Sequence, residues 1–255
     1  KIMRQSNSMN NPQNRPRLLL TNDDGYQAQG LELLHKALSQ FFEVVICAPE
    51  TNQSAQSHRI TIRESIYTRS YEHGYIVSGS PVDAVHLALA DLVRTDIDLV
   101  ISGMNHGSNL GDDYHYSGTL AAAREAALYG YRAVALSMDN FDKTIAKEHA
   151  NFIAKYLYQY WLDCPQGVLV SMNLPEHQTQ NVKQTTLGSY ERGLMSFEKF
   201  TSKRHQGQWY WIGRLERGKS EDFAIVQEGK ISVTAIDYRE NILGNYISLP
   251  FIEKF

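Results

Sequence analysis

Two adjacent carboxylates, Asp23 and Asp24, stand shortly after a run of three leucines, separated from it by Thr21 and Asn22. Two like charges held side by side repel each other, and burying either one alone costs free energy. A divalent cation removes both penalties, and adjacent carboxylate oxygens suit hard ions such as Mg²⁺ or Mn²⁺. Gly25 then allows a tight turn away from the pair. A solvated turn at a strand end explains the same dipeptide, so the metal interpretation needs support from elsewhere in the chain.

That support comes from residues 102–119, SGMNHGSNLGDDYHYSGT, a long segment of glycines and polar side chains. Asn105 and Asn109 offer side-chain carbonyl oxygens as ligands and amide groups as donors. The glycines allow backbone N–H groups to face an anion. His106 and His115 could donate a proton to a leaving group or bind a phosphate, although an ordinary polar loop lining is the simpler explanation.

The segment ends in Ser117, Gly118 and Thr119, which begin an alanine-rich stretch typical of a helix. Free N–H groups and the helix dipole make such an N-terminus a natural phosphate site. An ordinary Ser/Thr N-cap fits equally well. Carboxylates, asparagines and a helix N-terminus together favour a metal-assisted phosphate site over these separate explanations.

Short apolar runs alternate with helical patterns through most of the chain. We expect helices over 29–40, 81–93, 118–129 and 143–162. We expect strands over 17–21, 43–49, 75–79, 98–103, 133–138 and 168–173. The strands are rich in Val, Ile and Leu without strict alternation, which indicates burial on both faces. The fold class predicted is therefore α/β, a doubly wound, mostly parallel sheet sandwiched by helices and Rossmann-like.

In such a sheet, ligands bind beyond the carboxyl ends of the strands. The acidic pair, the loop over 48–59, the loop over 78–85 and the segment 102–119 all follow predicted strands. We expect these four loops to outline one pocket.

The pattern changes after residue 176. Strands are expected over 208–213 and 230–236 with no clear helix between them, and a long mobile loop over 190–207. We therefore divide the chain into a disordered segment 1–16, an α/β catalytic core 17–176 and a β-rich extension 177–255. The extension carries several aromatic residues on exposed-looking strands, so it is predicted to pair between subunits: Trp209, Tyr210, Trp211, Tyr246 and Phe251.

Composition excludes several classes of protein. The net charge of −3 gives no basic field for a stable nucleic-acid complex. No apolar run approaches the ~20 residues that span a membrane, and the polar N-terminus lacks the apolar core of a signal peptide. Cys47 and Cys164 form no CxxC pattern and are expected to be reduced thiols of a cytoplasmic protein.

Four stretches resemble the SurE (survival protein E) family of nucleotidases in order and spacing, from about residue 17 to 175: LLLTNDDGYQAQGLELL, APETNQSAQS, SGSPVDAVHLAL and SGMNHGSNLGDDYHYSGTLAAAREAALYG. YWIG and DFAIVQEGKISVTAI, nearer the C-terminus, are also similar to that family. The resemblance implies one divalent metal ion per subunit, Mg²⁺ or Mn²⁺, and a homodimer or homotetramer.

The resemblance also implies roles for individual residues. The metal ligands would be Asp23, Asp24, Ser54 and Asn105. Asn22 would orient the acidic pair or the substrate and join the two acids as a catalytic residue. The phosphate or substrate would be bound by Asn109, Ser117, Gly118 and Thr119.

The chain departs from the family pattern at three places. Ala28-Gln29-Gly30 stands where the family often has Ala-Pro-Gly, and Gln53-Ser54-Ala55 where it often has Arg-Ser-Gly. Ser80 replaces a frequent Thr. No metal ligand is lost, but the missing arginine puts the substrate preference in doubt. Lys199, Lys203 and Arg204 could contact an anionic substrate, although a solvated loop explains them as well.

The function expected is hydrolysis of nucleoside monophosphates to nucleoside and phosphate by metal-activated water, as a 5'-nucleotidase with 3'-nucleotidase activity as a further option. No serine or cysteine nucleophile next to a base is evident, which favours direct attack by water. An aspartyl-phosphate mechanism needs an Asp-x-Asp spacing that residues 22–25 lack. The alternative of another class is a nucleotide-binding regulatory protein without turnover.

Overall fold

The structure, a computed structural model, describes residues 15–93, 95–188, 195–200, 208–214 and 221–237. Its centre is a nine-stranded sheet in the order β3-β4-β2-β1-β5-β6-β7-β11-β8. The strands in that order are Thr68–Tyr71, Gly74–Val77, Glu43–Pro49, Arg17–Thr21, Leu99–His106, Ala133–Met138, Val168–Leu174, Ile231–Asp237 and Val182–Gln184. The six strands from β4 to β7 run parallel, whereas β3 and β11 pair antiparallel with their neighbours β4 and β7.

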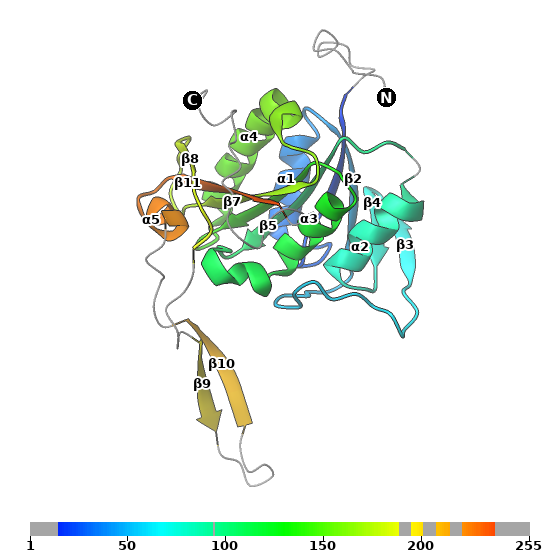
Figure 1. Ribbon diagram of the computed structural model, residues 1–255. Helices are drawn as coiled ribbons and strands as arrows, with labels where there is room; N and C mark the ends of the chain where they lie inside the picture. Colours follow the sequence, from blue (N-terminus) through cyan, green and yellow to red (C-terminus); the bar gives the residue numbers. More distant parts are fainter. Residues whose placement is uncertain (1–14, 94, 189–194, 201–207, 215–220, 238–255) are drawn as a thin grey trace.

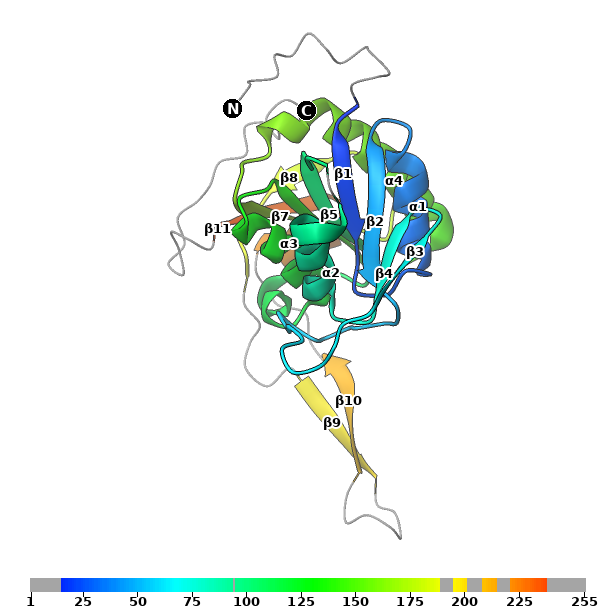
Figure 2. The ribbon, with the colours of Figure 1, turned by 90° about the vertical axis from the view of Figure 1, so that its right-hand side faces the viewer.

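Helices cover both faces of the sheet (Figures 1 and 2). Helices α1 (Gln29–Leu38) and α4 (Lys143–Tyr160) pack on one face, and α2 (Pro81–Leu87) and α3 (Gly118–Leu128) pack on the other. Alternate residues of each strand serve the two cores, because successive side chains of a strand point to opposite faces. In β1, Leu18 and Leu20 join the α1–α4 core, and Leu19 joins the α2–α3 core.

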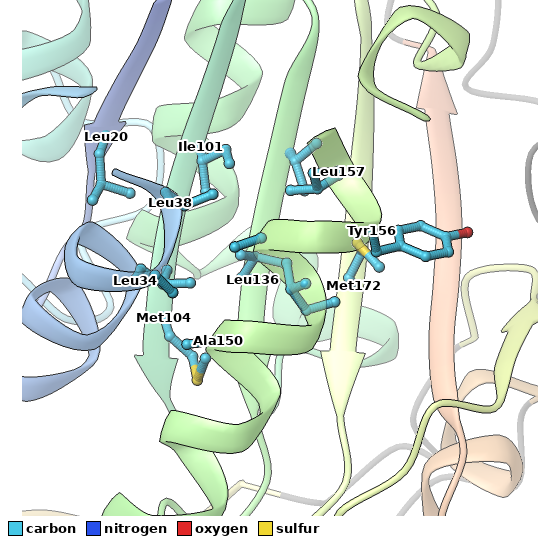
Figure 3. Close-up of a cluster of buried hydrophobic side chains, with 14 of the residues drawn as sticks. Leu20, Leu34, Leu38, Ile101, Met104, Leu136, Ala150, Tyr156, Leu157 and Met172 are labelled. Atoms are coloured by element: carbon cyan, nitrogen blue, oxygen red, sulfur yellow. The ribbon is translucent and has the colours of Figure 1, made fainter. Parts of the chain in front are cut away.

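Figure 3 shows the larger of the two cores, where Leu34 and Leu38 of α1 lie with Ala150 and Leu157 of α4 against the strands. These side chains are almost fully buried. Burial on both faces of the sheet explains why the sequences of these strands are continuously apolar and do not alternate between apolar and polar residues.

The chain reverses its direction of winding between β1 and β5. From β1 it proceeds through α1 to β2 on one side, while β5 lies on the other side of β1 and leads through α3 to β6. The loops that leave β1 and β5 therefore diverge to opposite faces and leave a crevice at their carboxyl ends, where ligands bind in open α/β sheets. The acidic pair follows β1, and residues 107–117 follow β5.

The predicted fold class is confirmed, and all six predicted strands of the core and all four predicted helices occur. Strand β5 is longer than expected, because it continues through Met104, Asn105 and His106. The start of the segment 102–119 is thus strand rather than loop. Helix α2 continues as one π-helical stretch, Ala88–Leu92.

One expectation for the C-terminal part is wrong, because helix α5 (Glu221–Gln227) lies between the two strands predicted there. The second of these strands is β11, which pairs with β7 and completes the main sheet. The first is β10 (Gln208–Arg214), which forms a separate antiparallel hairpin with β9 (Met195–Phe200). Strand β9 occupies part of the region expected to be a mobile loop.

The hairpin projects away from the sheet in both views (Figures 1 and 2). Tyr246, Phe251 and the N-terminal segment lie outside the described residues, so the predicted boundaries at 16 and 176 and the pairing of tails remain predictions. Within the part of the chain that the structure describes, no helix combines the length and apolar character needed to cross a membrane.

Candidate active site

The loop after β1 turns sharply at the acidic pair. Gly25 adopts a φ of +97°, and a side chain there would press on the backbone of Thr51, with a Cβ–C distance of 3.1 Å. Asn22 closes the turn, because its Nδ2 donates to the Gly25 carbonyl oxygen at 2.9 Å. The Oδ1 atom of Asn22 is buried and has no hydrogen-bond partner among the residues that the structure describes. A buried acceptor of this kind is costly unless a further group contacts it.

Asp23 is buried against the N-terminus of α3. Its side chain is 3% exposed, and the Thr119 hydroxyl donates to its Oδ1. Burial raises its pKa to about 6, and the charge of Asp24 adds to this, against the lowering effect of the Thr119 hydrogen bonds. Gly118 is required for this approach, since a Cβ there would lie 2.8 Å from the Cβ of Asp23.

Asp24 is half-buried and connects two other loops. Its Oδ1 accepts a hydrogen bond from Asn52 Nδ2 at 3.2 Å, and its Oδ2 accepts one from the backbone N–H of His106 at 3.3 Å. The neighbouring Gln53 N–H donates to the Asp23 carbonyl oxygen at 2.7 Å. The loop after β2, the end of β5 and the start of α3 therefore all meet at the acidic pair. The loop over 78–85, also expected at this pocket, instead contacts the loop after β2, where Ser80 Oγ donates to the Arg59 carbonyl oxygen at 2.6 Å.

Ser54 and Asn105 come from two of these converging segments. Ser54 is exposed, and its backbone N–H donates to Asn52 Oδ1 at 2.8 Å, which holds the tip of the loop. Asn105 donates from Nδ2 to the Gly107 carbonyl oxygen at 2.9 Å, so its Oδ1 is left as the acceptor. Each residue thus offers an uncharged oxygen on a segment that contacts Asp24.

Asn109 fastens the loop after β5 to the sheet. Its Nδ2 donates to Ser137 Oγ at 2.7 Å, its backbone N–H donates to Asn173 Oδ1 at 2.8 Å, and its carbonyl oxygen accepts from Asn173 Nδ2 at 3.1 Å. These contacts place Asn109 as a buried anchor for residues 107–111. Its predicted contact with substrate stays a prediction.

Ser117 is the N-cap of α3, because its Oγ accepts a hydrogen bond from the Leu120 N–H at 3.1 Å. The capping explanation of this serine is therefore confirmed, and its role toward a phosphate stays a prediction.

His106, the last residue of β5, and His115, in the segment that follows, are both exposed. The ring of His106 stacks on Phe141 with the centroids 3.8 Å apart, and His115 is exposed beside Tyr114. Lys203 and Arg204 fall outside the described residues, as does the side chain of Lys199.

The residues of the site fit a hard divalent cation. Among the described residues no group of three or more His, Cys, Asp or Glu could hold a metal ion, so a cation here would depend on two carboxylates and on neutral oxygens. That donor set suits Mg²⁺ or Mn²⁺ and not zinc. Asp23 has a pKa raised by burial, and the Oδ1 atom of the preceding Asn22 is buried without a hydrogen-bond partner among the described residues. A cation beside the two residues would satisfy both groups.

The family model described as Survival protein SurE matches residues 18–193. The chain belongs to the SurE family. A 5'-nucleotidase SurE of Aeromonas hydrophila subsp. hydrophila is 35% identical over 240 residues, which cover 86% of this chain and 91% of that protein. A 5'/3'-nucleotidase SurE of Erwinia tasmaniensis is 36% identical over 231 residues, which cover 86% and 89%. The crystal structure of a SurE protein from Aquifex aeolicus matches with a TM-score of 0.76 at 28% identity, over 89% of this chain and 95% of that one.

The structure shows the surroundings of two of the three departures from the expected family pattern, at Ser80 and at residues 53–55. Ser80 still caps α2, with a reciprocal pair of hydrogen bonds to Asp83. Gln53 points along its own loop, where its Nε2 donates to Thr51 Oγ1 at 3.2 Å. Ala55 adopts a φ of +59°, a conformation that favours the glycine frequent in SurE proteins.

Sequence reasoning missed Asn52, which holds Asp24 and the Ser54 backbone together. Its only sequence signal was an asparagine in a polar loop after a buried strand. It also did not foresee that Thr119 would contact Asp23 directly, because that contact depends on how α3 packs against β1.

Proposed function

We propose that the protein is a divalent-metal-dependent nucleotidase that hydrolyses nucleoside monophosphates to nucleoside and phosphate. The observation that carries the proposal is the buried Asp23, whose pKa is raised by burial at the point where three other segments meet. The names of the SurE relatives supply the nucleotide substrate.

The chain's own residues divide the work of holding the reactants. Asp23, Asp24, Ser54 and Asn105 would hold the cation, Mg²⁺ or Mn²⁺. Such an ion, when bound, polarises a phosphoryl oxygen and makes water more acidic. Thr119 fixes the rotamer of Asp23, and Asn52 fixes that of Asp24.

The phosphoryl group would lie between the acidic pair and the N-terminus of α3. Ser117, Gly118 and the helix dipole would stabilise the charge that develops on the phosphoryl oxygens. Asn109 would hold the neighbouring loop. Asp23 or Asp24 would orient the attacking water or accept its proton.

The two thiols of this chain are poor nucleophiles, so direct attack by water is favoured over a covalent cysteine intermediate. Burial raises the pKa of Cys47 and of Cys164 to about 12, so neither thiol ionises near neutral pH. Both cysteines are free and buried. A cytoplasmic location agrees with such thiols and is part of the proposal.

A homodimer or homotetramer is also proposed, with the projecting β9–β10 hairpin as the contact element. A two-stranded hairpin is marginal on its own, so packing on a second subunit would stabilise it. A monomeric mass in light scattering at micromolar concentration would contradict this part of the proposal.

The function is tested by phosphate release from 5'- and 3'-nucleoside monophosphates of several bases, with Mn²⁺ and with EDTA. We expect release that depends on Mn²⁺ and is lost in Asp23→Asn. Tight nucleotide binding without phosphate release would instead identify a regulatory protein and refute the enzyme. Equal release with EDTA would refute the metal dependence.

A further inference from the structure

Glu125, in the second half of α3, is a buried carboxylate outside the site described above. Glu125 is 8% exposed, and each of its carboxylate oxygens contacts one imidazole. His58 Nε2 lies 2.9 Å from Oε2, and His86 Nδ1 lies 3.1 Å from Oε1. Burial alone would raise the pKa of Glu125, but the hydrogen bonds with the two histidines outweigh it and hold the pKa below its ordinary value. The carboxylate is thus ionised and satisfied.

The two histidines come from different elements. His86 belongs to α2, whereas His58 belongs to the loop after β2, four residues beyond Ser54. The side chain of His58 is 25% exposed and that of His86 is 49% exposed. Glu125 therefore ties the loop that carries Ser54 to the body of α3.

Helix α3 also fixes Asp23, through the Thr119 hydroxyl at its first turn. One rigid element thus sets the position of two predicted cation ligands, Asp23 by its N-terminus and Ser54 through the contact of Glu125 with His58. The base of the loop has further fastenings, since Ser57 Oγ donates to the His115 carbonyl oxygen at 2.6 Å and Ser57 N–H donates to the Tyr116 carbonyl oxygen at 3.0 Å.

The segment from Ser54 to Ser57 needs such an anchor. Ala55 and Ser57 both adopt positive φ, at +59° and +54°, conformations that residues with a side chain adopt at a cost. Unless its base is held, a loop with two such residues relaxes toward ordinary conformations, and Ser54 would move with it.

We propose that Glu125 and His58 are positioning residues of the cation site, which hold the Ser54 loop at a fixed distance from Asp23. The inference rests on the proposed function for its chemistry, because Ser54 is taken as a ligand there. It adds a pair of residues that contact neither cation nor substrate.

The experiment compares His58→Ala with His86→Ala. Each variant removes one imidazole from Glu125, but only the His58 change releases the ligand loop. The first measurement is Mn²⁺ affinity by calorimetry, and the second is hydrogen exchange of the amides of residues 52–56 in metal-free protein. Melting temperatures are recorded for both variants, since a general loss of stability has to be separated from a local effect.

For His58→Ala we expect Mn²⁺ affinity to fall about tenfold, the low end of the loss seen when a supporting group of a metal site is removed. Exchange at 52–56 should become faster. His86→Ala should lower the melting temperature and leave both readouts unchanged. His58→Gln, which places an amide donor near the former Nε2, should recover part of the affinity.

Equal losses of affinity in the two alanine variants would overturn the inference, because Glu125 would then act only through stability. Unchanged exchange in His58→Ala would overturn it as well. A wild-type protein that binds Mn²⁺ but releases no phosphate would refute the proposed function alone, since affinity and exchange would still report on the loop.

Discussion

Helix α3 contacts two buried carboxylates, and they are held in opposite ways. Glu125, toward its C-terminal end, has an imidazole on each oxygen. Asp23, at its N-terminus, has the Thr119 hydroxyl on one oxygen and a second carboxylate as its sequence neighbour. The pKa of the first is lowered and that of the second is raised to about 6, although both are nearly inaccessible to solvent.

Burial of a carboxylate therefore does not by itself identify a group that binds a ligand. Each oxygen of Glu125 is paired with a group that the chain itself supplies, so this carboxylate needs no ligand. Asp23 lacks a cationic partner among the contacts that the structure describes. A chain that keeps such a group loses stability unless something binds to it, and that loss is the signature of a ligand site.

The largest effect expected from this comparison is on activity. Asp23→Asn removes a ligand charge and should lower kcat/KM for a nucleoside monophosphate by about two to three orders of magnitude, the several kcal/mol that a catalytic cation contributes. Steady-state kinetics at limiting Mn²⁺ measures this. Glu125→Gln should reduce kcat/KM far less, and equal reductions in the two variants would remove the distinction between the carboxylates.

Stability should change in the opposite direction. In metal-free protein at neutral pH, Asp23→Asn should raise the free energy of unfolding by up to about 3 kcal/mol, which is the difference between a pKa of about 6 and the ordinary 3.8. Glu125→Gln should lower it by about 1–3 kcal/mol, because a charged hydrogen-bond acceptor is lost. Urea unfolding in EDTA measures both, and a destabilised Asp23→Asn would contradict the account.

The pH dependence of the two effects should also differ in sign. The folded pKa of Asp23 lies above its unfolded value. The contribution of this carboxyl group to the free energy of unfolding is therefore complete below about pH 4 and is lost as the pH rises through about 6. The folded pKa of Glu125 lies below its ordinary 4.5, so its contribution is present above that value and is lost as the pH falls through the folded pKa. Unfolding of each variant against wild type from pH 4 to pH 8 tests the prediction for Asp23, and the more acid range tests that for Glu125.

A smaller effect is expected at the N-cap of α3. Ser117→Ala should cost about 1 kcal/mol of stability through the lost hydrogen bond from Leu120 N–H. If this helix end also binds the phosphoryl group, kcat/KM should fall by about one to two orders of magnitude. Asp142 caps α4 in a similar way, with its Oδ1 accepting from Thr144 N–H and Ile145 N–H, so Asp142→Ala is the matched control. Equal kinetics in both cap variants would leave Ser117 as a cap alone.

The smallest effect concerns the loop conformation. Ala55→Gly should stabilise the protein by about 0.5–1 kcal/mol, because the positive φ of Ala55 is strained for a residue with a Cβ. Ala224 is exposed and lies in the middle of α5, so Ala224→Gly should instead destabilise the protein by about 1 kcal/mol. Thermal unfolding of the pair is the measurement, and a loss of stability in Ala55→Gly would show that the loop is unstrained.

Much of the fold could be predicted because the signal was local. The runs at β1, β2 and β6 are apolar on both faces, and helix α1 has a clear apolar face. Helix α5 was missed because it is only seven residues long, and two of its buried side chains, Phe223 and Val226, belong to a small separate cluster with Leu110. Strands β3 and β8 were missed because they are short edge strands with few buried residues.

The site could be predicted only as a set of loops. Strand order places the loops after β1, β2 and β5 on one edge, so their convergence follows from topology. Which atoms meet depends on packing between elements that are distant in sequence. The contact of Thr119 with Asp23, that of Asn52 with Asp24 and that of His58 with Glu125 are of this kind, and no spacing within the chain encodes them.

The acidic pair after β1 is proposed to hold a cation. Calorimetric titration of Mn²⁺ into metal-free wild type, Asp23→Asn and Ser117→Ala tests it most directly. We expect one bound ion per chain in wild type and in Ser117→Ala, and an affinity at least about a hundredfold weaker in Asp23→Asn, the upper end of what the loss of a merely supporting group costs. Binding of Mn²⁺ to Asp23→Asn with the wild-type affinity would contradict the account.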